Sequence, residues 1–253
     1  MHGLIALALL TFTLANAHAL SDREIASIGR RVWQNECGGT REGLTSWNSG
    51  ESFASLGIGH VIWYPKGERG PFEESFPALV RFLAANGVKI PAWLKPGAPC
   101  PWRTRAEFQS AAKGRQMSEL RDLLASTVAL QSRFLAQRME AALSKLLAAT
   151  SPNRRAHVKK QFEKLAASGK GTFALIDYVN FKGEGTNSTE RYNDCGWGLL
   201  QVIEGMRDDD SAAESFAASA ARVLSQRVKN SPPERDESKW LPGWVRRVEA
   251  YAR

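Results

Sequence analysis

The feature that most constrains the fold is a long segment, over about residues 107–149, in which apolar residues recur at helical spacing. Its main apolar positions are Leu120, Leu123, Leu124, Val128, Phe134, Leu135, Met139, Leu143 and Leu146. Such spacing places these side chains near one face of a helix, and a face of this length has to be buried against other elements. The pattern therefore predicts continuous helix over residues 107–149 in a mainly helical part of the chain.

A second helix is predicted over residues 21–36, where Ser21 and Glu24 have the spacing of a capping box. The apolar stripe of this helix is formed by Ile25, Ile28 and Val32, and the glycines that come after Cys37 end it. Further helices are predicted over residues 73–87, 153–167, 172–181, 197–206, 210–229 and 243–252. Residues 44–65 have the composition of short strands and turns. We expect an α+β, mainly helical chain with a β-containing lobe at about residues 37–66, followed by a larger helical lobe.

The first residues have the composition of an export signal. Residues 3–17 are apolar and uncharged, and Ala17 and Ala19 form an Ala-x-Ala cleavage site. The run is shorter than the roughly 20 residues that a membrane span needs, and no later segment is long and apolar enough to span. We therefore expect a signal peptide over residues 1–19, a single domain over residues 20–253, a periplasmic or secreted location, and no stable membrane insertion.

Charge and cysteine content narrow the choice of partners. The net charge of +8 favours anionic polymers such as cell wall, lipid headgroups or nucleic acid. The basic residues are scattered and no nucleic-acid motif is present, which makes nucleic acid the weakest of these partners. Cys37, Cys100 and Cys195 allow one disulfide, and no Cys-x-x-Cys pair or His cluster supports a metal site. We expect a monomer that needs no metal or cofactor.

Glu36 is the first candidate for chemistry. It lies four residues after Val32, so it continues the buried stripe to the C-terminal end of the first helix. Loss of solvation and the negative end of the helix dipole both disfavour the ionised carboxylate there. A carboxyl group that keeps its proton suits a general acid for glycoside cleavage. The alternative is an ordinary ion pair with Arg30 or Arg31.

The segment between Glu36 and His60 resembles the active-site segment of phage-type lysozymes, the muramidases of the lysozyme-like superfamily. In that family the acid ends the first helix, a hairpin folds over the cleft, and a Thr-Ile-Gly-x-Gly-His segment forms the return strand. Ser55-Leu56-Gly57-Ile58-Gly59-His60 is similar to that segment. The resemblance implies that the glycines let the strand pass close beneath the cleft. It also implies that His60 is a buried, hydrogen-bonded support and not a catalyst.

Two later stretches strengthen the resemblance, and all three occur in the family's order. "FALIDYVNFKGEG", residues 173–185, is similar to a helix that crosses the helical lobe of these lysozymes. "LPGWVRRVEAYAR", residues 241–253, is similar to their C-terminal segment. Together the matches cover about a quarter of the chain. The resemblance implies a lysozyme-like fold, with a small β-hairpin lobe, a larger helical lobe and a cleft between them.

The chain also departs from the family pattern. Phage-type lysozymes carry an aspartate between the acid and the threonine, and this interval contains none. Asn48 falls near the expected place but cannot act as a base, so Glu51 is the carboxylate that would substitute for it. Ser55 stands in place of the threonine and keeps a hydroxyl group that can hold water. Glu42 is a rival acid, because "REGL" is similar to the family's Glu-Gly-x-Leu; Glu36 is preferred because it continues the buried stripe.

A further segment, residues 182–205, is dense in polar and aromatic groups. Its "GWGLLQV" resembles the cleft-lining Gly-Leu-Met-Gln-Val run of goose-type lysozymes and lytic transglycosylases. By this resemblance Glu184, Tyr192 and Gln201 would bind sugar hydroxyl and N-acetyl groups. The alternative for Glu184, as for Glu190, is a solvated turn. Three tryptophans are candidates for stacking on sugar faces, with the core as their alternative place: Trp47, Trp63 and Trp197.

The resemblance implies a glycosidase that cleaves peptidoglycan glycan strands, with Glu36 as the general acid. If Glu51 lies about 6.5–9.5 Å from Glu36, hydrolysis should invert, whereas a separation of about 5–5.5 Å would open a retaining route. Three alternatives stay open: a lytic transglycosylase, a chitin or chitosan hydrolase, and a non-catalytic glycan-binding protein on the same scaffold.

Overall fold

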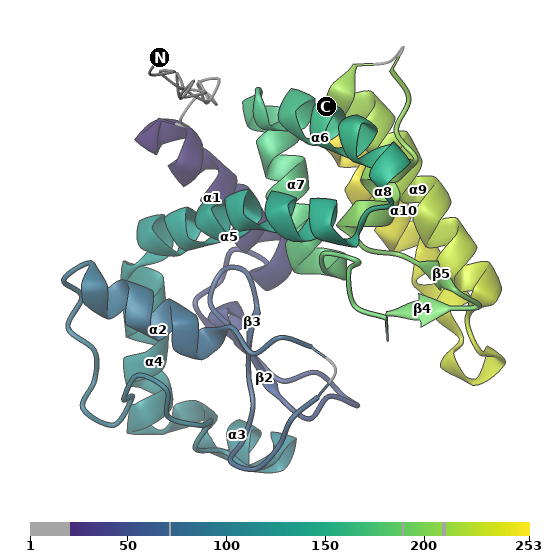
Figure 1. Cartoon of the computed structure of the whole chain (residues 1–253). Coiled ribbons are helices and arrows are strands. Elements are labelled where there is room, and N and C mark those ends of the chain that lie inside the picture. Colours follow the sequence, from purple (N-terminus) through teal and green to yellow (C-terminus); the bar gives the residue numbers. More distant parts are fainter. Residues whose placement is uncertain (1–20, 71, 189, 209–210) are drawn as a thin grey trace, which may run out of the picture.

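The longest described helix, α5 (Val128–Ala149), lies across the middle of the molecule (Figure 1). The structure is a computed structural model that describes residues 21–70, 72–188, 190–208 and 211–253, so the expected signal peptide lies outside the described residues. A small sheet lies below α5 in Figure 1, with α2 (Phe76–Ala85), α3 (Arg105–Ser110) and α4 (Arg115–Ser126). The helices above α5 and to its right are α6 (Arg155–Ala166), α7 (Gly169–Lys182), α8 (Leu199–Glu204), α9 (Ala212–Asn230) and α10 (Leu241–Glu249).

The helix α5 connects the two parts because it packs against α2 on one side and against α6 and α7 on the other. It also packs along α1 (Asp22–Cys37). Buried apolar residues from both parts belong to one hydrophobic cluster. The prediction of a mainly helical α+β chain with a small antiparallel sheet is therefore confirmed.

Both ends of α1 are fixed by local signals. The Ser21 hydroxyl accepts a hydrogen bond from the Glu24 backbone N–H at 3.3 Å, and the Glu24 carboxylate accepts one from the Ser21 N–H at 2.9 Å. The predicted capping box is thus formed. At the other end Gly38 takes the left-handed conformation, with φ of 60°, and stops the helix. These caps place Glu36 in the last turn of α1.

The sheet is antiparallel in the order β1-β2-β3, with β1 (Thr45–Ser46), β2 (Ala54–Leu56) and β3 (Val61–Trp63). Leu56 pairs with Val61, so residues 57–60 form the tight turn between β2 and β3. The expectation of a strand running through these residues is wrong. Gly57 and His60 have φ values of 72° and 46°, and the left-handed region is incompatible with an extended strand.

The two glycines of this turn lie where the backbone packs closely against neighbouring helices. A Cβ atom added to Gly57 would lie 2.4 Å from Oε1 of Gln131 on α5. One added to Gly59 would lie 3.0 Å from Leu135 of α5 and 3.0 Å from Oδ1 of Asn180 on α7. The turn therefore packs against α5 and α7 so closely that a Cβ at either glycine would crowd their side chains, most severely at Gly57.

The segment over residues 107–149 is not one continuous helix. It is divided into α3, α4 and α5 by a 3₁₀ turn at Ala111–Lys113 and by two breaks. Gly114 adopts an extended conformation, with ψ of 161°, and Thr127 departs from helical geometry between α4 and α5. The Thr127 hydroxyl donates to the Leu123 carbonyl at 2.7 Å, a local bond that competes with the helical pattern. The apolar spacing survives these breaks, which is why spacing alone did not reveal them.

A second, two-stranded sheet was not predicted. It consists of β4 (Arg191–Tyr192) and β5 (Cys195–Gly196), which pair antiparallel across Asn193 and Asp194. Both of these turn residues have positive φ, 48° and 60°, as a two-residue hairpin turn requires. The Asn-Asp dipeptide was the available signal for this hairpin.

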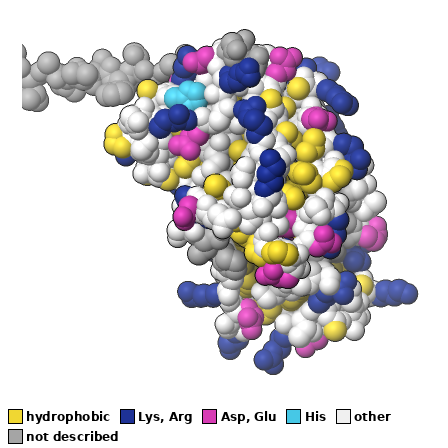
Figure 2. Space-filling model, turned by 90° about the vertical axis from the view of Figure 1, so that its right-hand side faces the viewer, with side chains coloured by type: hydrophobic (Ala, Val, Ile, Leu, Met, Phe, Trp, Pro, Cys, Tyr) yellow, Lys and Arg dark blue, Asp and Glu magenta, His cyan; other side chains and the backbone are white. Residues whose placement is uncertain are grey.

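The surface, the helices and the cysteines bear on three further expectations: scattered basic residues, no membrane span and one possible disulfide. Figure 2 shows Lys and Arg side chains spread over one face among acidic and apolar ones. None of the described helices is both long and apolar enough to cross a membrane. Cys37, Cys100 and Cys195 are all free thiols, so the disulfide that composition allows is not formed.

Candidate active site

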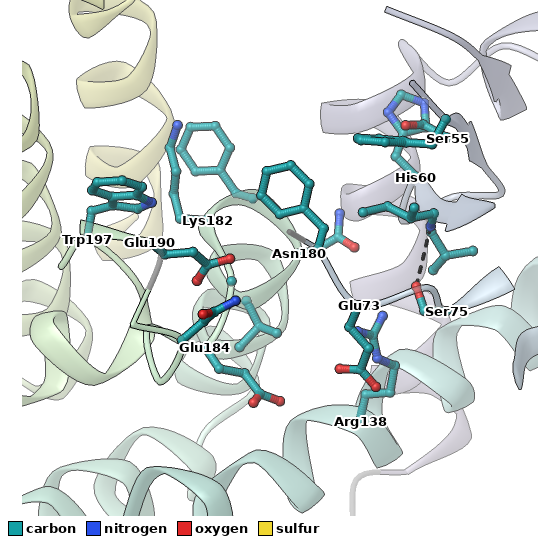
Figure 3. Close-up of a pocket in the computed structure, with 18 of the residues that line it drawn as sticks. Ser55, His60, Glu73, Ser75, Arg138, Asn180, Lys182, Glu184, Glu190 and Trp197 are labelled. Atoms are coloured by element: carbon teal, nitrogen blue, oxygen red, sulfur yellow. Dashed lines mark hydrogen bonds between the residues drawn. The ribbon is translucent and has the colours of Figure 1, made fainter. Parts of the chain in front are cut away.

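A cleft of about 590 Å³ opens beside the small sheet and the C-terminal end of α7. Glu36 at the end of α1 lines it, as do Glu51 and Ser55 from the β1–β2 hairpin. Figure 3 shows Ser55 and His60 on one side, and Lys182, Glu184, Glu190 and Trp197 on the other. The cleft thus brings together carboxylates, cations and aromatic rings from both parts of the molecule.

Glu36 is held by an arginine from the far end of the sequence. Arg247 of α10, 211 residues away, donates from Nη2 to Oε1 of Glu36. The ion-pair alternative named Arg30 or Arg31 as the partner, and the structure gives Arg247 instead. The side chains of Glu36 and Arg247 are 14% and 16% exposed, so the pair lies largely out of water.

The charge of Arg247 is already balanced by a second carboxylate. Asp177 of α7 is fully buried and accepts from Nε and Nη2 of Arg247 at 2.8 and 2.9 Å. Asp177 also accepts from the Tyr251 hydroxyl at 2.6 Å and from Asn35 at 3.3 Å. Burial works against the guanidinium, but Asp177 and Glu36 together raise the pKa of Arg247 above its ordinary value. Two carboxylates therefore share one cation, and Glu36 faces a guanidinium that Asp177 has largely neutralised.

His60 lies beside Glu36 with its ring spanning two groups. Its Nδ1 is 3.6 Å from Oε2 of Glu36, and its Nε2 is 3.0 Å from the Gly43 carbonyl oxygen. This carbonyl can only accept, so the bond requires the Nε2 proton. The arrangement fits a supporting residue that holds the turn against the end of α1.

The β1–β2 hairpin carries Glu51 over the same cleft. The Asn48 side-chain amide donates to Oε2 of Glu51 at 3.1 Å, and the Glu51 N–H donates to the Asn48 carbonyl at 3.3 Å. Burial raises the pKa of Glu51, while the Asn48 hydrogen bonds and the nearby His60 partly oppose the shift. Ser55 is buried on β2 and lines the cleft. Asn48 thus orients the carboxylate of Glu51.

Glu42, the rival acid, has a different environment. Its side chain is 70% exposed, and its ion-pair contact is with Arg41 at 3.9 Å. Glu42 is not among the described residues that line the cleft. The preference for Glu36 is therefore consistent with where the two side chains lie.

The other end of the cleft has three acidic side chains. Lys145 of α5 lies 3.0 Å from Oε1 of Glu184 and 3.7 Å from Oε2 of Glu73, so one ammonium group joins two carboxylates. Burial, with a smaller effect from Glu184, raises the pKa of Glu190, and Arg227 opposes the increase. Glu184 lies in the cleft next to Glu190 (Figure 3), where both could meet polar groups of a ligand.

Two other predicted binding residues are engaged by the protein itself. The Tyr192 hydroxyl donates to Oε1 of Glu237 at 3.1 Å. The Gln201 side chain accepts from the Gly198 N–H at 3.0 Å and donates to the Gly185 carbonyl at 3.1 Å. Neither is among the described residues that line the cleft. Gln201 instead pins the loop after α7 to the start of α8.

The three tryptophans considered for sugar stacking lie in different environments. Trp47 and Trp63 are 6% and 1% exposed, and their indole N–H groups donate to the carbonyls of Glu51 and Ala98 at 2.8 Å. They belong to the core. Trp197 lines the cleft, with the Arg227 guanidinium 4.1 Å from its ring centroid.

Sequence reasoning missed four residues of this region: Asp177, Arg247, Lys182 and Phe72. Asp177 and Arg247 lie inside the two stretches that resemble lysozymes, and an aspartate within the apolar run "FALIDYV" was the available signal. Phe72 lines the cleft, is 45% exposed and makes an edge contact with Phe53 at 5.8 Å. No sequence pattern marks its exposure.

Nothing in the described part of the chain gathers three or more potential metal ligands. The described residues that line the cleft include carboxylates, hydroxyl groups and cationic side chains. Compared with models of protein families, with curated proteins and with solved structures, the chain gives no match.

Proposed function

We propose that the chain is an exported glycosidase that cleaves the glycan strands of peptidoglycan, with Glu36 as the general acid. The observation that carries the proposal is the meeting of Glu36, Glu51 and Ser55 along one cleft between a small sheet and a helical part. Two carboxyl groups at one cleft are what hydrolysis of a glycosidic bond requires. The resemblance of three ordered sequence stretches to phage-type lysozymes supports the same function.

The proposed role of Glu36 has to accommodate its ion pair with Arg247. Arg247 does not face Glu36 alone, because Asp177 accepts two hydrogen bonds from the same guanidinium. Arg247 then serves mainly to orient the carboxyl group toward the cleft.

Glu51 and Ser55 would position the attacking water molecule, and Glu51 would activate it. The Asn48 amide fixes the Glu51 carboxylate, and the Ser55 hydroxyl can hold a water molecule. The opposite assignment has one observation in its favour: burial raises the pKa of Glu51, which suits a proton donor. In that assignment Glu36, paired with Arg247, would act as the base or nucleophile.

A non-catalytic glycan-binding protein is the second candidate, and the Arg247–Glu36 ion pair favours it. Such a protein would keep the cleft but would not need a protonated carboxyl group. A lytic transglycosylase and a chitin or chitosan hydrolase would use the same acid, and the ends of the released products separate them.

The experiment is digestion of purified peptidoglycan by the wild type, Glu36→Gln and Glu51→Gln, with the released ends identified by mass spectrometry. We expect reducing ends from the wild type and a loss on the order of 10²–10⁴-fold for Glu36→Gln. Anhydro ends would indicate a transglycosylase. Release by Glu36→Gln at the wild-type rate would contradict the proposed role of Glu36, and no release by correctly folded wild type would favour the binding protein.

A second comparison assigns the two roles. We expect Glu51→Gln to lower turnover less than Glu36→Gln, because Ser55 and Asn48 share the positioning of water. An aryl glycoside with a good leaving group needs little acid assistance, so it should restore turnover to the acid variant. If Glu51→Gln is the variant that this substrate rescues, the roles of Glu36 and Glu51 are reversed.

A further inference from the structure

Lys182, the last residue of α7, lines the cleft and has an unusual environment. Its Nζ lies 3.4 Å from the ring centroid of Trp244 and 4.1 Å from that of Phe181. In Figure 3 its amine points away from the carboxylates of Glu184 and Glu190. The side chain is therefore held against aromatic rings at the wall of the cleft, with its amine directed away from the carboxylates on the same side.

Two carboxylates, Glu237 and Glu36, act electrostatically on Lys182, and both are paired with arginines. Glu237 accepts from Nε and Nη2 of Arg227 at 2.8 Å and also pairs with Arg235 at 3.3 Å. Glu36 is held by Arg247. Among the described residues, no ion pair within 4.0 Å includes Lys182. Lys145, the other lysine among the described residues that line the cleft, has a different environment because it already pairs with two carboxylates.

We infer that Lys182 binds an anionic group of the ligand, and that this group is a carboxylate carried by the glycan. This inference rests on the proposed function, because it names the part of a peptidoglycan strand that the cleft would distinguish from chitin. The carboxylate has two sources in that polymer: the lactyl group of the muramic acid sugar, when it carries no peptide, and the stem peptide. A ligand carboxylate would supply the counter-charge that the protein withholds from Lys182.

The charges around Lys182 give this site a pH dependence. Burial, followed by Arg227, lowers the pKa of Lys182 well below its ordinary value, and Arg247 acts in the same direction; Glu237 and Glu36 oppose it. A bound carboxylate favours the charged amine and raises this pKa again. Binding should therefore take up protons, and affinity should weaken as the pH rises above the lowered pKa of free Lys182.

The test compares three ligands that share one sugar backbone. Chitotetraose has no carboxylate, a tetrasaccharide of alternating N-acetylglucosamine and N-acetylmuramic acid has lactyl carboxylates, and the same tetrasaccharide with stem peptides has peptide carboxylates. Binding is measured by calorimetry in the Glu36→Gln background, which prevents cleavage and leaves Arg247 paired with Asp177. Two buffers of different ionisation enthalpy report proton uptake.

We expect Lys182→Met to weaken binding of a carboxylate ligand on the order of tenfold or more, while chitotetraose changes far less. Met keeps most of the apolar stem against Trp244 and Phe181 and removes the buried amine, so the melting temperature should hold or rise. Lys182→Arg should keep the preference for the carboxylate ligand. Lys159→Met is the control for loss of a lysine charge: Lys159 of α6 pairs with Glu163 and is not among the described residues that line the cleft, so the ratio between ligands should not change.

The preferred ligand identifies the source of the carboxylate. Preference for the bare muramyl tetrasaccharide over chitotetraose assigns the lactyl group, and preference seen only with stem peptides assigns the peptide. Equal affinity of the parent protein for all three ligands, or a preference that survives in Lys182→Met, would overturn the inference even if cleavage depends on Glu36. Carboxylate-dependent binding without any Glu36-dependent cleavage would support the role of Lys182 and contradict the proposed glycosidase activity.

Discussion

Asp177 has no exposed side-chain surface, yet its two oxygens hold side chains from three elements: Arg247 of α10, Tyr251 of the 3₁₀ turn Ala250–Ala252, and Asn35 of α1. A buried carboxylate is tolerated only when it is paired and hydrogen-bonded. Asp177 meets this condition and, in doing so, decides how much positive charge Arg247 presents to Glu36.

Asp177→Asn should therefore affect both stability and activity. Removing one partner of a buried ion pair costs about 3–5 kcal/mol, which chemical denaturation would measure. Glu36 would then be the remaining carboxylate partner of Arg247, so turnover on purified peptidoglycan should fall as well. Tyr251→Phe is the control, because it removes one hydrogen bond to Asp177 and keeps its charge. Unchanged turnover in folded Asp177→Asn would contradict this electrostatic role.

Glu51 provides a separate prediction on stability. Burial raises the pKa of Glu51 in the folded chain, so this group favours folding when protonated, and that contribution is lost as the pH rises through the folded pKa. Gln has no such dependence. The melting temperature of Glu51→Gln minus that of the wild type should therefore increase from pH 4 to pH 7. Melting curves at several pH values test this, and a difference that stays constant would mean that burial does not control Glu51.

At the scale of elements, the turn over residues 57–60 sets the position of the sheet on the helices. The Gln131 side chain of α5 donates to the Leu124 carbonyl at 2.6 Å and accepts from the Ile58 N–H at 2.9 Å. The turn thus supplies a donor that the buried amide needs. A shift of this turn would move His60, and with it the contact between the sheet and the end of α1.

Gly57→Ala should destabilise the protein by more than backbone strain alone. A left-handed alanine costs about 1–2 kcal/mol, and the added Cβ would also crowd Gln131. Gly97→Ala is the matched control: Gly97 has φ of 84°, and a Cβ there would meet nothing within 4 Å. Urea denaturation should show a loss for Gly57→Ala that exceeds the loss for Gly97→Ala by about 1 kcal/mol or more. Equal losses would mean that the turn can move away from α5.

At the scale of the whole molecule, the three thiols report how tightly the two parts are packed. Cys37 and Cys100 are buried, and burial raises the pKa of each to about 12, whereas Cys195 is exposed. A thiol reagent should modify Cys195 quickly in the native protein, and Cys37 and Cys100 only in denaturant. Peptide mapping after timed labelling checks this. Fast native labelling of Cys37 would mean that the packing between α1 and the turn opens.

The sequence was sufficient for features that depend on local rules. The capping box at Ser21, the stop at Gly38 and the placement of Glu36 in the last turn of α1 are all set by residues close in the chain. The division of the chain into a small sheet and a larger helical part could also be predicted from spacing. The hairpin that carries Glu51 was expected only from the resemblance to phage-type lysozymes, because no local pattern predicted it.

The rest depends on contacts that spacing does not encode. Arg247 reaches Glu36 only because α10 packs on α9 and the C-terminal turn packs on α7. Tyr192 and Gln201 have the polar groups of binding residues, but their partners lie in the protein at Glu237 and in the loop after α7. Which polar group faces the cleft is decided by tertiary packing, and no local pattern records it.

The pairing of Glu36 with Arg247 also has a consequence for synthesis. The ribosome makes Glu36 and Asp177 long before Arg247, and until then the two carboxylates have no common cation. A nascent chain shorter than 247 residues would have to bury Asp177 uncompensated, which strongly opposes closure of this region. The Glu36–Arg247–Asp177 contacts can therefore form only after Arg247 has been made and α10 has packed on α9.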